Sequence, residues 1–176
     1  MEAVVDFFDL ARDRRSIRAF REIPIEPEQL ERVLEAANRA PSAGNLQAYQ
    51  IYLAKSDSTR AQLAQAAGAQ DFLTQAPVVL VFCADPKRST PRYGRRGAEL
   101  YCVQDATIAC TFAMLAATAL GLGTVWVGAF DAESVRSAIN APEGVVPVAI
   151  LPIGHAGETP LPTRRRSSRD LVHETR

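Results

Sequence analysis

The chain has 176 residues, 47% of them hydrophobic and 23% charged, and its 20 basic and 20 acidic side chains give a formal net charge of zero. This length and composition are typical of one globular domain with a sizeable core, so we expect a single domain over residues 1–176. The balanced charge argues against nucleic-acid or membrane binding as the main activity.

No secretory leader and no membrane span are expected. The first residues, MEAVVDFFDLARD, carry acids where a signal peptide carries basic residues, and no apolar run reaches about 18 residues without a polar break. The three cysteines have neither metal-binding nor redox spacing, and we interpret Cys83, Cys102 and Cys110 as buried thiols. The prediction is a cytoplasmic protein without a metal site.

The N-terminal part predicts two helices. Apolar residues at helical spacing indicate a short amphipathic helix over residues 2–12. Pro27 and Glu28 begin a second helix, which ends before the stretch PSAGNLQ (residues 41–47). One face of this second helix is apolar and consists of Leu30, Val33, Leu34 and Ala37.

The middle of the chain alternates strands and helices. Apolar runs predict strands at residues 50–54 and 76–85, and the segment between them is expected to be a helix that ends at Gly68. The segment from Lys87 to Gly97 is basic and contains a proline and two glycines, so it is predicted to be a loop.

A long helix is expected next, from about Ala98 to Leu120, with Gly121 as its C-cap. It is apolar nearly all round, which indicates burial, in part against another subunit.

The last part of the chain predicts two strands, at residues 124–130 and 146–156, with a short helix after Asp131 between them. A Pro- and Arg-rich arm follows over about residues 157–176. Helices and strands do not alternate strictly as βαβ units, so the predicted fold class is α+β and not a doubly wound sheet.

Arginine is concentrated in two places. All of the 20 basic residues except Lys55 and Lys87 are arginine, with five arginines between residues 12 and 21 and four between residues 164 and 169. The first cluster contains RRSIRAF (residues 14–20), which could be a solvated basic patch at a helix C-terminus.

The same stretch could instead bind an anion, because arginine forks match phosphate oxygens and a serine hydroxyl adds a hydrogen bond. If the segment is extended, Arg14, Ser16 and Arg18 share one face, a spacing suited to a phosphomonoester. The residues alone leave both interpretations open.

The stretch PSAGNLQ could be an ordinary loop that leaves a helix. Its Ser42, Asn45 and Gln47 also offer hydroxyl and amide groups beside the flexible Gly44, which would suit the polar edge of a planar heterocycle. The later GLG follows a helix and precedes a strand, the reverse of the dinucleotide-binding order. Neither histidine has a partner that would indicate a catalytic triad.

Four motifs occur in order: RRSIRAF, then PSAGNLQ about two dozen residues later, then GLGTVWVGAF after a long helix, then a basic tail with LVH. In this order they resemble the nitroreductase family over essentially the whole chain. The resemblance implies an FMN-dependent oxidoreductase with a mixed central β-sheet flanked by helices. It also implies an intertwined homodimer with two FMN molecules at the interface.

Residue by residue, the resemblance implies contacts to FMN. The phosphate, the ribityl chain and the polar ring edge would be bound by Arg14, Ser16 and Arg18, with Arg15 adjacent. From the tail, Arg165 with Arg164 would close on the phosphate.

The remaining contacts concern the ring. The partner subunit would contribute Pro41, Ser42, Ala43 and Asn45. The backbone of Val127 and Gly128 would lie near the flavin N5. No side chain is required as an acid or base, so no catalytic residue is assigned.

The implied reaction is hydride transfer from NADH or NADPH through FMN N5 to an electron-poor small molecule such as a nitroaromatic or quinone, in ping-pong order. Within the same fold, a flavin-fragmenting enzyme or a reductive dehalogenase is an alternative. Outside it, a flavin carrier or sensor without turnover remains open, and nucleic-acid binding through the arginines is disfavoured by the zero net charge. The natural acceptor and the preferred nucleotide are not fixed by the sequence.

Overall fold

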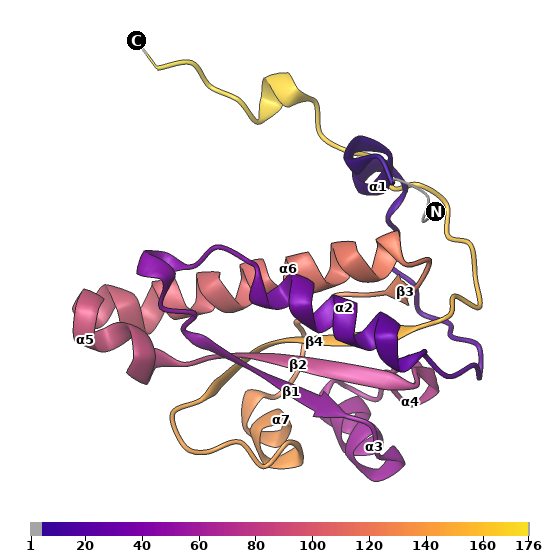
Figure 1. Ribbon diagram of the computed structural model, residues 1–176, viewed down its shortest axis with the longest axis horizontal. Helices are drawn as coiled ribbons and strands as arrows, with labels where there is room; N and C mark the ends of the chain where they lie inside the picture. Colours follow the sequence, from indigo (N-terminus) through magenta and orange to yellow (C-terminus); the bar gives the residue numbers. More distant parts are fainter. Residues whose placement is uncertain (1–4, 176) are drawn as a thin grey trace.

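A four-stranded antiparallel sheet forms the middle layer of the computed structural model, which describes residues 5–175. The strands are β1 (Tyr49–Ala54), β2 (Val78–Ala84), β3 (Gly123–Thr124) and β4 (Val146–Gly154), in the spatial order β1-β2-β4-β3. Figure 1 shows that this sheet separates two layers of helices. The α+β class predicted from the sequence is confirmed.

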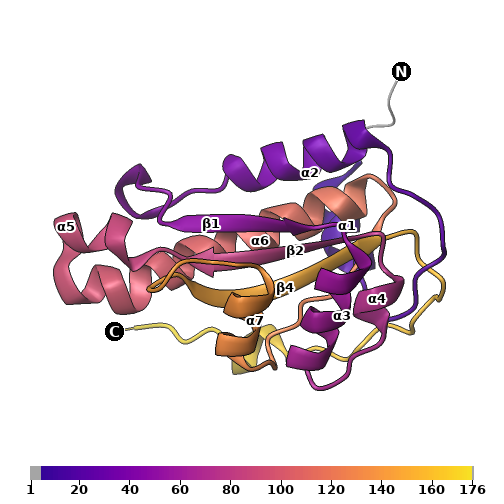
Figure 2. The same cartoon turned by 90° about the horizontal axis from the view of Figure 1, so that it is seen from below.

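Helices cover both faces of the sheet (Figures 1 and 2). On one face lie α2 (Pro27–Asn38) and α6 (Cys102–Ala119), and on the other lie α3 (Asp57–Ala66), α4 (Phe72–Gln75) and α7 (Ala132–Ala138). Each of these helices except the very short α4 was expected from the sequence. The Gly121 C-cap of α6 is confirmed by its positive φ of 74°.

The central strand β2 explains why both faces need cover. All seven of its residues are buried, and alternate side chains enter opposite cores. Leu80 and Phe82 pack with α2 and α6, whereas Val79 and Val81 pack with α3 and α7. A strand that is apolar on both faces belongs in the middle of a layered fold.

The expected loop at Lys87–Gly97 is wrong, because the chain forms helix α5 (Pro86–Arg96) and then a π-helical turn (Gly97–Tyr101) that leads into α6. Pro86 occupies a first-turn position, where its missing N–H costs nothing. Pro91 and Gly94, which suggested a loop, lie inside the helix, and the chain bends at a kink at Gly94, with φ 56° and ψ −143°. The α-helical part of the expected long helix therefore begins at Cys102 and not at Ala98.

The expected strand at 124–130 is much shorter than predicted. Only Gly123 and Thr124 form a regular strand, and Val127 then makes one isolated bridge to Ile150. The register of β3 on β4, continued along the chain, brings Pro152 opposite Val125. Because proline has no N–H to donate, the ladder is interrupted at that point.

The expected mixed sheet is also corrected, since all the named strands pair antiparallel. The parallel pairing is limited to one bridge between Ser16 and Thr124.

Both ends of the chain lie apart from the sheet (Figure 1). Helix α1 spans Phe7–Asp13 and starts later than expected, because the Asp6 side chain caps it, and residues 2–4 of the expected helix lie outside the described residues. The arm from residue 157 is almost wholly exposed. It is extended except for a single helical turn at Ser168–Asp170.

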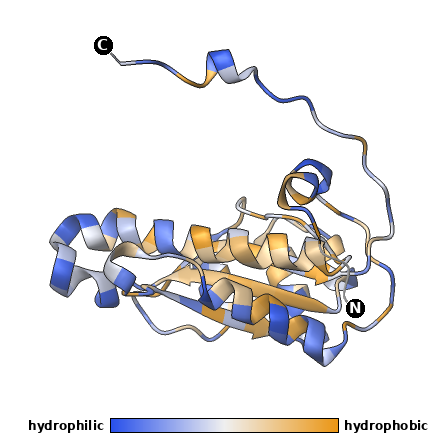
Figure 3. Cartoon of the chain, turned by 45° about the horizontal axis from the view of Figure 1, so that its top comes forward, coloured by the Kyte–Doolittle hydropathy of each residue, from blue (hydrophilic) through white to orange (hydrophobic). Residues whose placement is uncertain are grey.

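The outer face of α6 is apolar although residues 5–175 leave it only partly covered. Figure 3 shows α6 hydrophobic along most of its length, and Ile108, Phe112, Leu115 and Ala119 repeat there at helical spacing without being buried. The continuous helical run Pro86–Ala119 is long and apolar enough to cross a membrane by length and composition alone. The inner face of α6 packs on α2 and the sheet, as in the core helix of a globular protein.

Candidate functional site

The segment RRSIRAF runs extended along the edge of the sheet. The N–H of Ile17 donates to the carbonyl of Thr124 at 2.9 Å, and the N–H of Gly157 donates to the carbonyl of Ala19 at 2.8 Å. Ile17 and Phe20 are buried in the core, which fixes which side chains face outward. The extended backbone was the condition for placing Arg14, Ser16 and Arg18 together.

These side chains line a cavity of about 760 Å³ between α1, the RRSIRAF segment and the arm. We call it the arginine cavity. Four of the predicted site residues line it from the N-terminal segment and one from the arm: Arg14, Arg15, Ser16, Arg18 and Arg165. The structure thus brings together residues from the two ends of the chain, which the sequence only placed in separate clusters.

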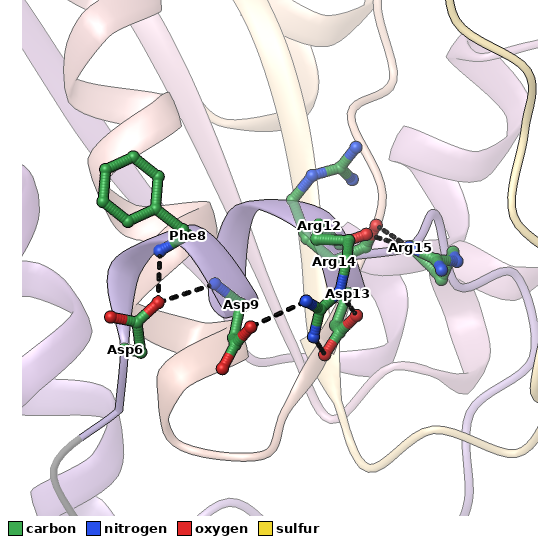
Figure 4. Close-up of polar contacts among 7 residues, drawn as sticks. All are labelled: Asp6, Phe8, Asp9, Arg12, Asp13, Arg14 and Arg15. Atoms are coloured by element: carbon green, nitrogen blue, oxygen red, sulfur yellow. Dashed lines mark hydrogen bonds and ion pairs between the residues drawn. The ribbon is translucent and has the colours of Figure 1, made fainter.

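The arginines of this cavity differ in whether a carboxylate pairs with them (Figure 4). Arg12 lies between Asp9 and Asp13, at 2.7 and 2.9 Å, and is neutralised locally. The Arg14 guanidinium makes no hydrogen bond or ion pair within residues 5–175, although the Arg14 backbone N–H donates to the carbonyl of Leu10 at 3.0 Å. Burial, together with the nearby Arg165 and Arg15 charges, lowers the pKa of the Arg14 guanidinium. A desolvated cation that faces other cations is suited to an anionic ligand.

The other arginines differ in what they offer. The Arg15 guanidinium turns back to the carbonyls of Arg12 and Arg14, at 2.6 and 3.0 Å, and so also caps the end of α1. The backbone N–H of Arg18 donates to the Glu158 carboxylate, and within residues 5–175 the Arg18 guanidinium makes no hydrogen bond or ion pair. In the arm, Arg166 donates to the carbonyl of Asp170 at 2.7 Å. Arg164 does not line the cavity.

The PSAGNLQ loop lines a second cavity, of about 530 Å³, at the N-terminal end of α6. We call it the loop cavity. Its walls are Pro41, Ser42 and Ala43 from the loop and Tyr101, Val103, Gln104, Asp105, Thr107 and Ile108 from the π turn and α6. The walls are mostly apolar with a few polar groups, as in sites for flat organic ligands.

The loop itself is tightly wound. Gly44, Asn45 and Gln47 all have positive φ, at 56°, 57° and 48°, and Asn45 borders a different hollow beside α2. The Ser42 hydroxyl accepts the N–H of Gln47 at 3.0 Å, so it is used inside the loop. Of the four predicted loop residues, three line the loop cavity and Asn45 does not.

The predicted ring contacts at Val127 and Gly128 lie on the segment after β3. Val127 is buried, and its N–H and carbonyl both pair with Ile150, at 3.0 and 2.9 Å. Its N–H is therefore used within the sheet, whereas Gly128 is exposed. A side chain at position 128 would crowd the Trp126 indole, 3.0 Å from the added Cβ.

The segments that line the two cavities lie at opposite ends of α6 in one chain: α5 with the PSAGNLQ loop at one end, and α1 with β3 at the other (Figure 1). The loop contacts α6 at Asp105, near its start, and Ser16 pairs with Thr124 just after its end. The 18 residues of α6 span about 27 Å at the usual helical rise. One chain therefore does not join the two sets of predicted residues into one site.

Sequence reasoning missed the residues that hold the loop. The Asp105 carboxylate accepts the N–H of Ala43 at 2.9 Å and that of Ala48 at 3.2 Å. From α5, Arg92 donates to the carbonyl of Gly44 at 3.1 Å and Arg88 to that of Leu46 at 3.2 Å. The available signal was an acid within an otherwise apolar helix, but its partners are distant in sequence.

Comparison with known proteins identifies the family of the chain. The nitroreductase family model matches residues 11–70 and 64–155, which include α2, the PSAGNLQ loop and α6. The FMN reductase (NAD(P)H) of Bacillus subtilis is 34% identical over 159 residues, covering 83% of this chain and 64% of its own length. The NADH dehydrogenase of Thermus thermophilus is 30% identical over 195 residues, covering 94% of this chain and 95% of its own length.

Solved structures share the fold. The NADPH:FMN oxidoreductase of Vibrio harveyi, in a complex with NAD+, superposes with a TM-score of 0.87 at 30% identity. The match covers 96% of this chain and 76% of that one. The chain belongs to the nitroreductase family.

Proposed function

We propose that this protein is an NAD(P)H-dependent flavin oxidoreductase that holds FMN and reduces electron-poor small molecules such as nitroaromatics or quinones. The single observation that carries the proposal is the arginine cavity, where Arg14, Arg18 and Arg165 converge from both ends of the chain. The names of the Bacillus and Vibrio relatives agree with it, since both include FMN and a nicotinamide nucleotide.

The residues present fit FMN. A phosphate dianion would neutralise the charges of Arg14 and Arg165, whose repulsion adds to burial in lowering the pKa of Arg14. Ser16 supplies a hydroxyl beside them. The mostly apolar loop cavity offers walls for the flat ring system, with Gln104 as a polar side chain among them.

A complete site needs two chains, and we propose a homodimer. If two α6 helices pack antiparallel through the outer stripe of Ile108, Phe112, Leu115 and Ala119, the loop cavity of one protomer meets the arginine cavity of its partner. The exposed aromatic rings of α1, Phe7 and Phe8, and the extended arm also lack cover within the chain.

Bound FMN would supply hydride transfer, taking a hydride from NAD(P)H and delivering it to the acceptor. The role of the protein is to bind, orient and stabilise. Arg14 and Arg165 would hold the phosphate, and the free Arg18 side chain would place positive charge toward the polar edge of the ring. The exposed backbone at Gly128 would leave an open face, which donor and acceptor would use in turn.

We place the enzyme in the cytoplasm. Cys83, Cys102 and Cys110 are all unpaired and buried, and burial raises the pKa of the Cys83 thiol to about 12. Protonated, unpaired thiols are typical of a reducing compartment.

The test is a two-step anaerobic titration of protein loaded with FMN. NADH or NADPH should bleach the visible absorbance of the bound flavin, and a nitroaromatic or quinone added afterwards should restore it. Steady-state rates should give parallel double-reciprocal lines, as ping-pong order requires. Protein that takes up no FMN would contradict the proposal, and bound flavin that neither nucleotide bleaches would favour a carrier or sensor.

A further inference from the structure

We propose that Asp105 is a positioning residue, which presets the PSAGNLQ loop for the flavin by holding its backbone from within the protein. The inference rests on the proposed function, because it concerns the loop that we assign to the flavin ring. It adds a residue from the buried side of α6 that does not itself need to touch the ligand.

The first argument is the pattern of contacts. Asp105 is 2% exposed, and each of its carboxylate oxygens accepts one backbone N–H, from Ala43 at one end of the loop and from Ala48 at the other. The two bonds, at 2.9 and 3.2 Å, span the whole turn between them. A single side chain therefore fixes both ends of the loop.

The second argument is the conformation that these bonds enclose. Gly44, Asn45 and Gln47 have φ between 48° and 57°, and the last two are not glycines. Such left-handed residues persist only where their surroundings determine them strongly. The loop is short and exposed at its tip, so the buried carboxylate, which bonds the backbone on both sides of these residues, is one of the constraints that hold them.

The third argument is that helix α5 holds two carbonyls of the same loop. Arg92 and Arg88 of α5 donate to the carbonyls of Gly44 and Leu46. The arginines donate to carbonyls of the loop, and Asp105 accepts from its N–H groups. The loop backbone is therefore bonded both by donors from α5 and by an acceptor from α6. The arginines are exposed, whereas Asp105 is the buried member of the arrangement.

The chemistry predicts what Asp105→Asn does. An amide has one acceptor oxygen and one NH2 group, so it can accept one of the two N–H groups but must face the other with a donor. The N–H of Ala48 is buried, so leaving it without an acceptor is costly. The amide oxygen should therefore stay with Ala48, and the N–H of Ala43 should lose its acceptor. The loop should then lose its preset shape although the side chain keeps its size.

The experiment compares Asp105→Asn with Asp85→Asn. Asp85 is also a buried carboxylate, but its side chain accepts from Gln50 at 2.9 Å and, within residues 5–175, makes no hydrogen bond to the loop. Asp85 is joined to Ala48 only by its backbone N–H, at 2.9 Å, and it begins α5 without a side-chain cap bond, so Asp85→Asn keeps both features. Three quantities are measured for each protein: amide hydrogen exchange at Ala43 and Ala48 without flavin, the dissociation constant for FMN, and the visible circular dichroism with FMN bound. Asp105→Asn should raise both the exchange rate at Ala43 and the dissociation constant by about tenfold and should weaken the dichroism.

Asp85→Asn should leave all of these values near those of the wild type. If both variants weaken FMN binding equally, or if Asp105→Asn changes neither exchange nor binding, the positioning role is wrong. If Asp105→Asn fails to fold, hydrogen exchange in the wild-type protein is the test. The Ala43 amide should be protected, and exchange at the rate of an unstructured chain overturns the proposal. If the wild type binds no FMN, the proposed function fails, while the exchange data still test Asp105.

Discussion

At the scale of single residues, the arginine cluster near the N-terminus contains neighbours with different roles. Arg12 is held by Asp9 and Asp13 and is fully compensated. Arg14, two residues later, has no carboxylate partner within residues 5–175, and its pKa is lowered by burial and by Arg165 and Arg15. The sequence placed Arg14 inside the RRSIRAF motif and Arg12 in the helix before it, and the contacts agree with that distinction, since Arg12 is paired and Arg14 is not.

We expect Arg14→Ala to weaken FMN binding strongly and Arg12→Ala to have little effect. A charge-assisted hydrogen bond contributes roughly 1.5–3 kcal/mol, which corresponds to a dissociation constant about 10- to 150-fold higher. The fold should survive, because removing Arg14 relieves its repulsion with Arg165. Quenching of FMN fluorescence on titration into the apo-protein measures both constants. Equal constants for the two variants would mean that the cluster is only a solvated patch.

At the scale of elements, α5 is the main addition that the structure makes. The sequence predicted α2, β2, α3, α7 and most of α6, because their apolar periodicity is strong and local. It missed α5 because Pro91 and two glycines indicate a loop, whereas the helix accommodates them by a kink at Gly94. The strand predicted at 124–130 was too long, because Pro152 interrupts the pairing of β3 with β4. The residue that faces Pro152 is set by the register of the folded sheet, which the sequence does not define.

The packing of α5 on the PSAGNLQ loop can be tested at Gly44, with Gly68 as the matched control. Both glycines have positive φ, at 56° and 74°, so alanine at either should cost about 1–2 kcal/mol of unfolding free energy. A Cβ at position 68 meets nothing within 4 Å, but at position 44 it meets Tyr93 and the Arg92 guanidinium, 2.6 Å away. Gly44→Ala should therefore also displace Arg92 from the loop.

Chemical denaturation and hydrogen exchange over α5 measure these two effects separately. The variants should have similar unfolding free energies, since the crowding atoms are the ends of flexible side chains. Exchange in α5 should rise in Gly44→Ala alone. If exchange in α5 is the same in both variants, the contact between the loop and α5 does not hold that helix in place.

At the scale of the whole molecule, eight of the predicted residues line two cavities about one helix length apart. Arg14, Arg15, Ser16, Arg18 and Arg165 meet in the arginine cavity, and Pro41, Ser42 and Ala43 lie in the loop cavity. The family resemblance predicted these residues together with Asn45, Val127, Gly128 and Arg164, which line neither cavity, and the assignment of all of them to FMN stays a prediction. It could not reveal Asp105, Arg88 or Arg92 as supports, because their bonds join residues 42 or more positions apart.

A composite site predicts complementation between two defective chains. Arg14→Ala damages the arginine cavity, and Ala43→Trp should fill the loop cavity beside Tyr101. Each homodimer should bind FMN poorly. After joint unfolding and refolding, half of the dimers are mixed, and each mixed dimer has one undamaged site, so about a quarter of the binding capacity should return. Sites contained within single chains would give no recovery.

The pairing of the two ends of the chain also bears on how the protein is made. The backbone of Arg18 is bonded to Glu158, 140 residues away, and residues 19 and 157 pair beside it. Contacts of such long range close large loops and form late in folding. During synthesis the N-terminal arginines emerge first and must wait for nearly the entire chain before their partners exist. The arginine cavity, which we propose binds the phosphate, is therefore complete only once both of its ends have been synthesised, and a nascent chain that lacks the arm would not retain the cofactor through it.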